Sequence, residues 1–362
     1  MNKHIFYIAA ACAALASCVK NEVRVNAPDK EITFQTVSTK AGAAFEKDKH
    51  FFSYAYFLEK DKTWDPDFAS AEPYIDKAVI TYEPGTAAGK GYWAAGDTYY
   101  WPKQGSLTFF AWTDNTIHHP TSNPAPSVGT GATVSCTPNT GIKIEKYSVK
   151  DNRNKDILVA EIAKDKTANE TATGAWKNGV PTVFRHALAK VEFKVNKRTN
   201  YPNVTFKVKK ITLTKVSTRG TFTQCQSTPN ENWGWNGWGL QENLPVFTSA
   251  AGKEVTKTAD STPEEFDALT PDPNTDYHIV LPQVLRDKIA PTITIEYEII
   301  TSYVTGNPVT EKVIETKDLK DIYKSDWECN KKYVLGITLG LNEIYWDPSI
   351  EGWENGDVTN IL

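Results

Sequence analysis

The sequence predicts an all-β protein built from antiparallel β-sandwiches. Segments that alternate apolar and polar residues recur along the chain, for example Lys190 to Val195 and Thr292 to Ile299, and this two-residue period is typical of half-buried strands. The composition also favours strands, because aromatic residues make up 12% of the chain and the only Met is the first residue. Long stretches with the 3.6-residue period of an amphipathic helix are hard to find.

The length and charge limit the number of domains and the kinds of partner. A chain of 362 residues suggests two domains, each large enough to close its own core. Forty Lys and Arg against 44 Asp and Glu give a net charge of −4, so we expect neither nucleic acid nor an anionic bilayer surface as a partner. A mean hydropathy of −0.45 excludes a multi-span membrane protein.

The first eighteen residues have the pattern of a bacterial lipoprotein signal. A charged start precedes an apolar run, Ile5 to Leu15, that is too short to span a bilayer, and the run ends in Leu15-Ala16-Ser17-Cys18. We expect residues 1–17 to be removed and Cys18 to carry a diacylglyceryl thioether and an N-acyl chain, which together anchor the protein in a membrane. The alternative is an ordinary secretory leader with a chance cysteine, which the full lipobox disfavours.

Strands are expected beyond a polar tether at residues 18–30. Phe51 to Leu58 and Leu107 to Trp112 are apolar on both faces, as expected for central strands or for strands covered by a second element. Tyr333 to Leu341 alternates regularly, and the parity flips afterwards at Ile344, which requires a bulge or a turn.

Two stretches rich in Pro and Gly, His118 to Gly131 and Asn230 to Gly239, are predicted to be loops. We place the domain boundary at the polar stretch Lys164 to Pro181, which has no apolar alternation. The division gives an N-terminal sandwich over residues 31–182 and a C-terminal sandwich over residues 183–362.

The residues form no recognisable catalytic or metal-binding constellation. Cys136, Cys225 and Cys329 are too far apart for metal-ligand spacing and odd in number, so we predict neither a metal site nor a disulfide. His118-His119 is interpreted as part of a solvated loop, and His186 as hydrogen-bonding the backbone at the domain junction. We therefore expect no enzymatic activity and no cofactor.

The segment Asn232 to Gly239 alternates Trp with Gly and Asn. Trp233, Trp235 and Trp238 could present flat rings to a sugar or to a protein partner. The alternative is a long loop whose tryptophans fold back onto the sandwich. We favour the second interpretation because an indole ring is costly to leave in water.

Several short motifs follow one another in a specific order along the chain. They are the lipobox at Cys18, Ile32-Thr33-Phe34 followed by Thr39-Lys40-Ala41, Tyr99-Tyr100-Trp101-Pro102 with Leu107 to Ala111, Phe184 to Val191, Leu281-Pro282-Gln283 followed by Ile293 to Ile299, and the ending Asn330 to Leu341 with Trp353. Each motif is weak alone, but together they resemble the fimbrillins of Bacteroidetes, the type V pilins and their Mfa-like relatives. The match covers nearly the whole mature chain.

The resemblance implies two transthyretin-like β-sandwich domains in tandem and a route of assembly. It implies export as a lipoprotein, display at the outer membrane surface, and proteolytic loss of the first strand. A strand from a neighbouring subunit then fills the groove, because an open sandwich exposes unpaired backbone groups that an incoming strand satisfies. The implied partners are other fimbrial subunits and, through the Cys18 lipid, the outer membrane.

The resemblance also assigns the strand that would be removed. Residues 31–40 contain the candidate strand, Glu31 to Thr36, and cleavage would fall between Lys40 and Ala41. Relatives are usually cut after an Arg, whereas this chain has Lys at the matching position. Either a protease that accepts Lys acts here, or the chain stays uncut as a lipidated accessory subunit.

The donor strand would come from Asn342 to Leu362. Its candidate anchors are apolar, namely Ile344, Trp346, Ile350, Trp353, Val358, Ile361 and Leu362. The alternative is that these residues belong to the last sandwich's own strands. The leading hypothesis is thus a structural or adhesive subunit of a surface fimbrium, and the second is a non-polymerising surface lipoprotein that binds glycan through exposed aromatic residues.

Overall fold

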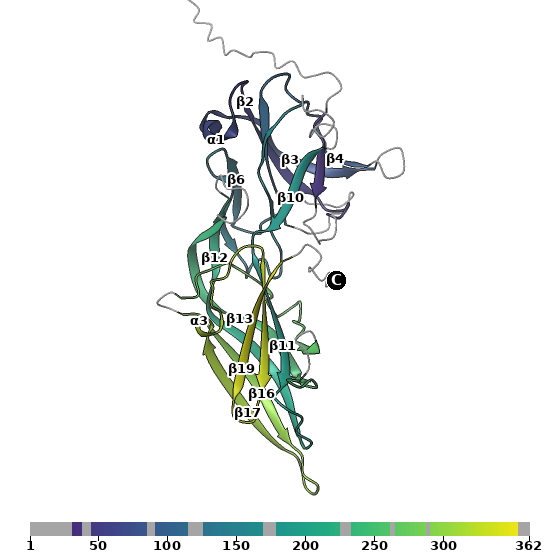
Figure 1. Cartoon of the computed structure of the whole chain (residues 1–362), viewed down its shortest axis with the longest axis vertical. Helices are drawn as coiled ribbons and strands as arrows, with labels where there is room; N and C mark the ends of the chain where they lie inside the picture. The colour runs from purple at the N-terminus through teal and green to yellow at the C-terminus, as the bar shows by residue number, and fades with distance from the viewer. Residues whose placement is uncertain are drawn as a thin grey trace, which may run out of the picture.

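Strands are the main secondary structure of the described chain, with only short helices, and they form three sheets (Figure 1), which confirms the predicted fold class. The structure is a computed structural model, and it describes residues 31–37, 45–84, 91–114, 126–168, 179–224, 233–260, 265–286 and 290–353. The molecule is elongated, with the N-terminal sheet at one end and the β16–β17 hairpin at the other (Figure 1).

The N-terminal sheet closes on itself. Its strands run in the order β2-β3-β4-β1-β10-β8-β5-β9, and β2 also pairs with β5. The bounds are β1 (Phe34–Val37), β2 (Phe51–Leu58), β3 (Glu72–Glu83), β4 (Tyr92–Ala95), β5 (Ser106–Thr113), β8 (Leu158–Ala160), β9 (Ala163–Lys166) and β10 (Val180–His186), with the short helices α1 (Trp64–Asp67) and η1 (Phe68–Ser70) after β2. Closure leaves a sheet of this kind with few unpaired edges.

The strands β2 and β5 are buried on both faces, as predicted. One face points into the closed sheet, where Phe51 and Phe109 belong to an aromatic core. The other face, including Phe52 and Phe110, joins a second hydrophobic cluster that extends into the rest of the molecule. Their two-sided apolar sequences are therefore explained by two separate packing layers.

The other two sheets pack around this second cluster. One has the order β17-β16-β12-β7-β6, with β13 also paired to β12, and the other has the order β14-β11-β18-β19, with β15 also paired to β11. The bounds are β6 (Thr133–Thr137), β7 (Gly141–Ser148), β11 (Ala189–Lys197), β12 (Val204–Thr223), β13 (Gly234–Glu254), β14 (Asp267–Ala268), β15 (Ile279–Val280), β16 (Thr292–Thr301), β17 (Val309–Asp318), β18 (Lys331–Leu339) and β19 (Ile344–Gly352), with helix α3 (Leu319–Ile322) after β17.

The boundary expected between residues 182 and 183 falls inside a strand. β10 pairs with β1 through Val180 to Val183 and with β8 through Phe184 to His186, so all of β10 belongs to the N-terminal sheet. The hairpin β6–β7 precedes the expected boundary, yet β7 pairs with β12 of a later sheet. The polar composition of Lys164 to Pro181 does not indicate which sheet β7 and β10 join, because strand pairing is decided by tertiary contacts.

The segment predicted as a loop over Asn230 to Gly239 is largely strand. β13 begins at Gly234, and Trp235 lies opposite Phe222 of β12. The Trp235 ring packs against Tyr147 and Phe222, and its Nε1 donates to the carbonyl of Ala187 at 2.5 Å. Burial of this indole outweighs the turn preference of the Gly and Asn residues around it.

His186 lies at the junction of the sheets, but its contacts differ from those expected. Its imidazole Nδ1 lies 2.7 Å from the carboxylate of Asp156, and its backbone N–H donates to the side-chain oxygen of Asn330. The Trp353 indole stacks on the imidazole, with ring centroids 3.8 Å apart and an interplanar angle of 2°. Trp353 also donates its backbone N–H to Asn330, so the end of β19 is fastened at this junction.

The half-buried His278 makes the stability of this fold depend on pH. Burial, and then the charge of Lys190, lower the pKa of His278 to about 4, whereas an unfolded His has a pKa of about 6.5. Between these values the unfolded chain binds a proton that the folded chain does not. We expect the free energy of unfolding to fall by up to about 3 kcal/mol from pH 7 to pH 4 through this residue.

The measurement is urea unfolding across this pH range, for the unmodified chain and for His278→Gln. The substitution should flatten the pH dependence, because Gln does not titrate. If the free energy of unfolding depends on pH in the same way in both proteins, His278 is not the cause of the dependence.

Candidate functional site: the first and last strands

The strand β1 is held on both edges. It runs parallel to β10, with Phe34 to Val37 opposite Val180 to Val183, and antiparallel to β4, with Phe34 opposite Trp93. Just before the strand, the Ile32 N–H donates to Tyr99 at 2.8 Å. β1 therefore closes the gap between β4 and β10, and it satisfies backbone groups of both neighbours.

The side chains of this first segment alternate between the core and the solvent. Ile32 and Phe34 are 5% and 3% exposed, whereas Glu31 and Gln35 are exposed. The Phe34 ring meets Phe51 and Phe109 edge-on, with centroids 5.7 and 5.8 Å away, a favoured aromatic geometry. The first segment thus contributes two apolar anchors, Ile32 before the strand and Phe34 at its start, to the aromatic core.

Gly179 allows β1 to lie close to the start of β10. Its φ is +88°, and a Cβ at this position would lie 2.6 Å from the carbonyl carbon of Phe34 and 2.9 Å from the nitrogen of Gln35. Both the backbone conformation and the close approach require glycine. Sequence reasoning did not single out this residue, although a Gly directly before an apolar strand is a recognisable signal of close approach.

The segment Glu31 to Thr36, which the resemblance assigns as the removable strand, overlaps β1, which the structure has over Phe34–Val37, and the removal of this strand stays a prediction. The proposed cleavage site, Lys40-Ala41, lies outside the described residues, as do Cys18 and the signal. The lipidation and cleavage of these residues therefore stay predictions.

The candidate donor residues Ile344, Trp346 and Ile350 lie on β19, which pairs along its whole length with β18 of the same chain. They lie opposite the buried residues Leu339, Ile337 and Tyr333. Ile344 and Trp346 are only partly buried, and Ile350 is 46% exposed. In this structure these residues therefore occupy the last sandwich's own strand, as the alternative interpretation expected.

β19 is also the last strand of its sheet, so its other backbone edge has no strand partner among the described residues. Its side chains on one face alternate as Ile344, Trp346, Pro348 and Ile350, of which the first three are partly buried and Ile350 is exposed. Trp353, just beyond the strand, is only 2% exposed, which places this candidate anchor inside its own chain. Val358, Ile361 and Leu362 lie outside the described residues.

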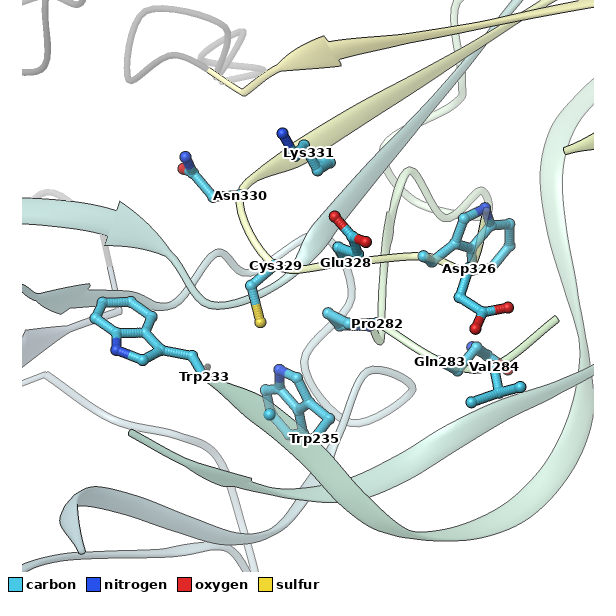
Figure 2. Close-up of a pocket in the computed structure, with 12 residues that line it drawn as sticks. Trp233, Trp235, Pro282, Gln283, Val284, Asp326, Glu328, Cys329, Asn330 and Lys331 are labelled. Carbon is cyan, nitrogen blue, oxygen red and sulfur yellow. The ribbon is translucent and has the colours of Figure 1, made fainter. Parts of the chain in front are cut away.

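A pocket of about 580 Å³ lies beside the start of β13 (Figure 2). Its lining includes Trp233, Trp235, Trp327, Cys329 and Asn330. The Trp233 and Trp235 side chains are only 6% and 5% exposed, so they form walls and do not offer open ring faces to a sugar. The side chain of Trp238 is outside what the structure describes. The favoured interpretation, that these tryptophans pack onto the sandwich, thus agrees with the positions of two of the three.

Other chemistry is sparse in the described ranges. No group of three or more His, Cys, Asp or Glu residues there could hold a metal ion. Cys136 and Cys329 are free, and burial raises the pKa of the Cys329 thiol to about 12, so this thiol stays protonated at neutral pH. Among the described helices, none is long and apolar enough to cross a membrane.

Comparison with known proteins agrees with this geometry. The fimbrillin-like family matches residues 30–353 of the chain. The chain belongs to the fimbrillin-like family. The match begins next to β1 and ends at Trp353, so both candidate strands of this fimbrillin-like protein lie within it. No curated protein matches the chain.

One of two similar solved structures supports the fold of this fimbrillin-like chain. A crystal structure of a fimbrial protein from Bacteroides vulgatus has a TM-score of 0.64 and 16% identity, covering 89% of this chain and 99% of that one. A candidate cell adhesion protein from Bacteroides uniformis has a TM-score of 0.47 and 14% identity, covering 90% and 100%. At these identities the first similarity concerns the fold alone, and the second score is too low to support an argument.

The contact between Gly179 and β1 can be tested with a matched pair of glycines. Gly179→Ala forces a Cβ against the backbone of β1, and we expect it to cost about 2 kcal/mol of stability beyond the strain of a positive φ. Gly131→Ala is the control, because Gly131 has a φ of +79° but no atom within 4 Å of the added Cβ. Urea unfolding measures the stability difference, and faster hydrogen exchange at Ile32 to Phe34 should appear only in Gly179→Ala. Equal effects of the two substitutions would rule out close packing on β1.

Proposed function

We propose that this fimbrillin-like protein is a structural subunit of a cell-surface fimbrium and that it polymerises by exchange of strands. The observation that carries this proposal is β1, an N-terminal strand that fills a gap in a closed sheet with two apolar anchors. Its removal would leave a slot between β4 and β10 that only another strand can satisfy.

An open slot would be unfavourable in water for two reasons. The edges of β4 and β10 would expose unpaired N–H and C=O groups, which act as a template for another strand. The loss of Ile32 and Phe34 would also expose the aromatic core around Phe51 and Phe109. Burying such apolar surface again contributes about 25 cal/mol per Å². An incoming strand with suitably spaced side chains therefore gains both backbone pairing and apolar burial.

The last strand has the side-chain pattern that the slot requires. The first segment presents Ile32, just before β1, and Phe34, a β-branched residue followed two positions later by an aromatic one. β19 presents Ile344 and Trp346 with the same spacing and the same order. We therefore infer that Ile344 and Trp346 of one subunit take the positions of Ile32 and Phe34 in the next.

The donor must first leave its own sheet. Because β19 is an edge strand with half-exposed side chains, its release breaks pairing on one side only, with β18. The buried Trp353 must also leave its stack on His186. The gain in the neighbouring slot, where a strand is paired on both edges, offsets these losses.

The signal at the start of the chain supports a route to the cell surface. A lipid on Cys18 would hold the exported subunit at the outer membrane, and cleavage after Lys40 would release it and open the slot together. The partners are then other fimbrial subunits. The second hypothesis, glycan binding through exposed tryptophans, is not supported by the buried positions of Trp233 and Trp235.

Strand exchange predicts that trypsin treatment, which removes β1 by cutting at Lys40, causes assembly into SDS-resistant ladders. Trp346→Ala should reduce the amount of polymer at least tenfold, because a large buried aromatic anchor contributes about 3 kcal/mol or more. Tyr345→Ala is the matched control, since Tyr345 is the neighbouring aromatic residue on the opposite face of β19. Both variants are first checked for folding by circular dichroism. Unchanged polymerisation of Trp346→Ala would exclude β19 as the donor.

A competing peptide tests the slot directly. A synthetic peptide of residues 31–37, added in excess during trypsin treatment, should occupy the slot and block assembly. The same peptide with Phe34→Asp should not, because a carboxylate is not stable in the aromatic core. Equal inhibition by both peptides would show that β1 is not held by its anchors.

The processing itself is read from the N-terminus of protein extracted from the cell surface. A sequence that starts at Ala41 agrees with cleavage and polymerisation. A blocked terminus at Cys18 on all of the protein would instead indicate a resident lipoprotein that keeps its first strand.

A further inference from the structure

The strand β17 is an edge that strand donation does not use. It is ten residues long, it pairs along its full length with β16, and it ends the sheet. Its other edge has no strand partner among the described residues. In Figure 1 it runs along the outside of the end of the molecule that is far from β1.

Both faces of β17 are open to solvent. On one face, Ile314 is 66% exposed. On the other face, Val309 is 56% exposed, and Glu311 and Glu315 lie opposite buried residues of β16 but are themselves exposed. A long edge strand with exposed apolar residues is a template for pairing with another chain unless its charges forbid it.

We propose that β17 pairs with β17 of a second copy of this chain, antiparallel and around a two-fold axis at Ile314. A two-fold axis perpendicular to a sheet leaves each face of the strand on the same side of the joined sheet. Residues that lie opposite each other must therefore both have even numbers or both have odd numbers. In the proposed register Ile314 lies opposite its own copy. Glu311 lies opposite Lys317, and the symmetry makes this ion pair twice.

The charges of β17 select this register. An axis at Val313 would place Glu311 opposite Glu315. An axis at Glu315 would place Glu315 opposite its own copy. An axis at Lys312 would place Lys312 opposite its own copy. Like charges directly opposite each other destabilise a sheet. Of the registers that pair most of the strand, only the one centred on Ile314 has no like charges opposite each other.

The contact would combine three favourable elements. The exposed Ile314 side chains would pack against each other at the centre, and each is left in water in the single chain. Glu311 and Lys317 have no ion pair within the described residues of one chain, so both are available to the other copy. The backbone edges would then join two sheets into one continuous sheet. The same charges that prevent indiscriminate pairing along this edge would permit one specific partner.

This contact goes beyond the proposed function, because β1 and β19 take no part in it. It is a side-to-side interaction between two copies, whereas strand exchange joins subunits end to end. The pairing of one strand with itself is weak in isolation, but repeated copies along two fimbriae would add their contributions. The structure thus assigns the free edge of β17 as the surface through which two subunits pair side to side.

The test uses charge reversal on the full chain carrying Cys18→Ala, which removes the lipid and keeps β1 in its slot, so strand exchange does not contribute. Sedimentation equilibrium at protein concentrations up to about 1 mM measures dimerisation. Glu311→Lys places Lys opposite Lys317, and Lys317→Glu places Glu opposite Glu311. Each single variant should lower the association constant about tenfold, because two pairs per dimer change from attractive to repulsive.

The two-fold symmetry provides two rescues. The double variant Glu311→Lys with Lys317→Glu restores opposite charges and should dimerise like the unmodified chain. A mixture of the two single variants should form a mixed dimer more readily than either variant forms its own, because all the pairs across the mixed interface are then complementary. A chain that stays monomeric at 1 mM, or single variants that dimerise as well as the unmodified chain, would overturn the proposal.

A cysteine at the axis tests the register. Ile314→Cys should form a disulfide-linked dimer on mild oxidation, because residues directly opposite each other on antiparallel strands lie about 4.5–5.5 Å apart. Lys312→Cys is the control on the same face, since Lys312 would lie opposite Thr316 and not opposite itself. Equal cross-linking by both variants, or cross-linking by Lys312→Cys alone, would contradict the register. Circular dichroism of every variant confirms that the fold is unchanged.

Discussion

The pairing of β1 on both of its edges is the constraint on which the N-terminal sheet depends. The ring of strands is closed only because β1 connects β4 to β10, and its two inward side chains complete the aromatic core behind them. A short strand near the end of a chain is usually the least secure part of a sheet. Here it occupies a position that is central in the sheet although it is close to the N-terminus in the sequence, and the proposed exchange of strands follows from that combination.

The fold class and many strand positions could be predicted because the buried faces of strands determine the spacing of apolar residues in the sequence. β2 and β5 were expected to be covered on both faces, and each lies between two hydrophobic clusters. The parity change after Leu341 was expected to need a bulge or a turn, and a turn separates β18, which ends at Leu339, from β19. Such features depend on which faces of a strand are buried, which the spacing of apolar residues reports directly.

The errors arose where long-range pairing decides the structure. Nothing in the composition of Lys164 to Pro181 indicates that β10 returns to the N-terminal sheet, or that β7 leaves it to pair with β12. The Gly and Asn residues around Trp235 favour a turn locally, yet β13 passes through them because the indole is buried and its Nε1 is bonded to Ala187. Gly179 was missed for the same reason, since its role depends on a strand almost 150 residues earlier in the chain.

The crossing of the β6–β7 hairpin has a consequence for how this molecule behaves as a material. The hairpin lies between β5 and β8 of the N-terminal sheet along the chain, but β7 pairs with β12, and Tyr56 of β2 donates its hydroxyl to the Cys136 carbonyl at 2.7 Å. Neither half of the molecule can therefore melt without taking core residues away from the other. The subunit should bend and twist as a single stiff body, so the flexibility of any filament made from it would reside in the links between subunits and not within them.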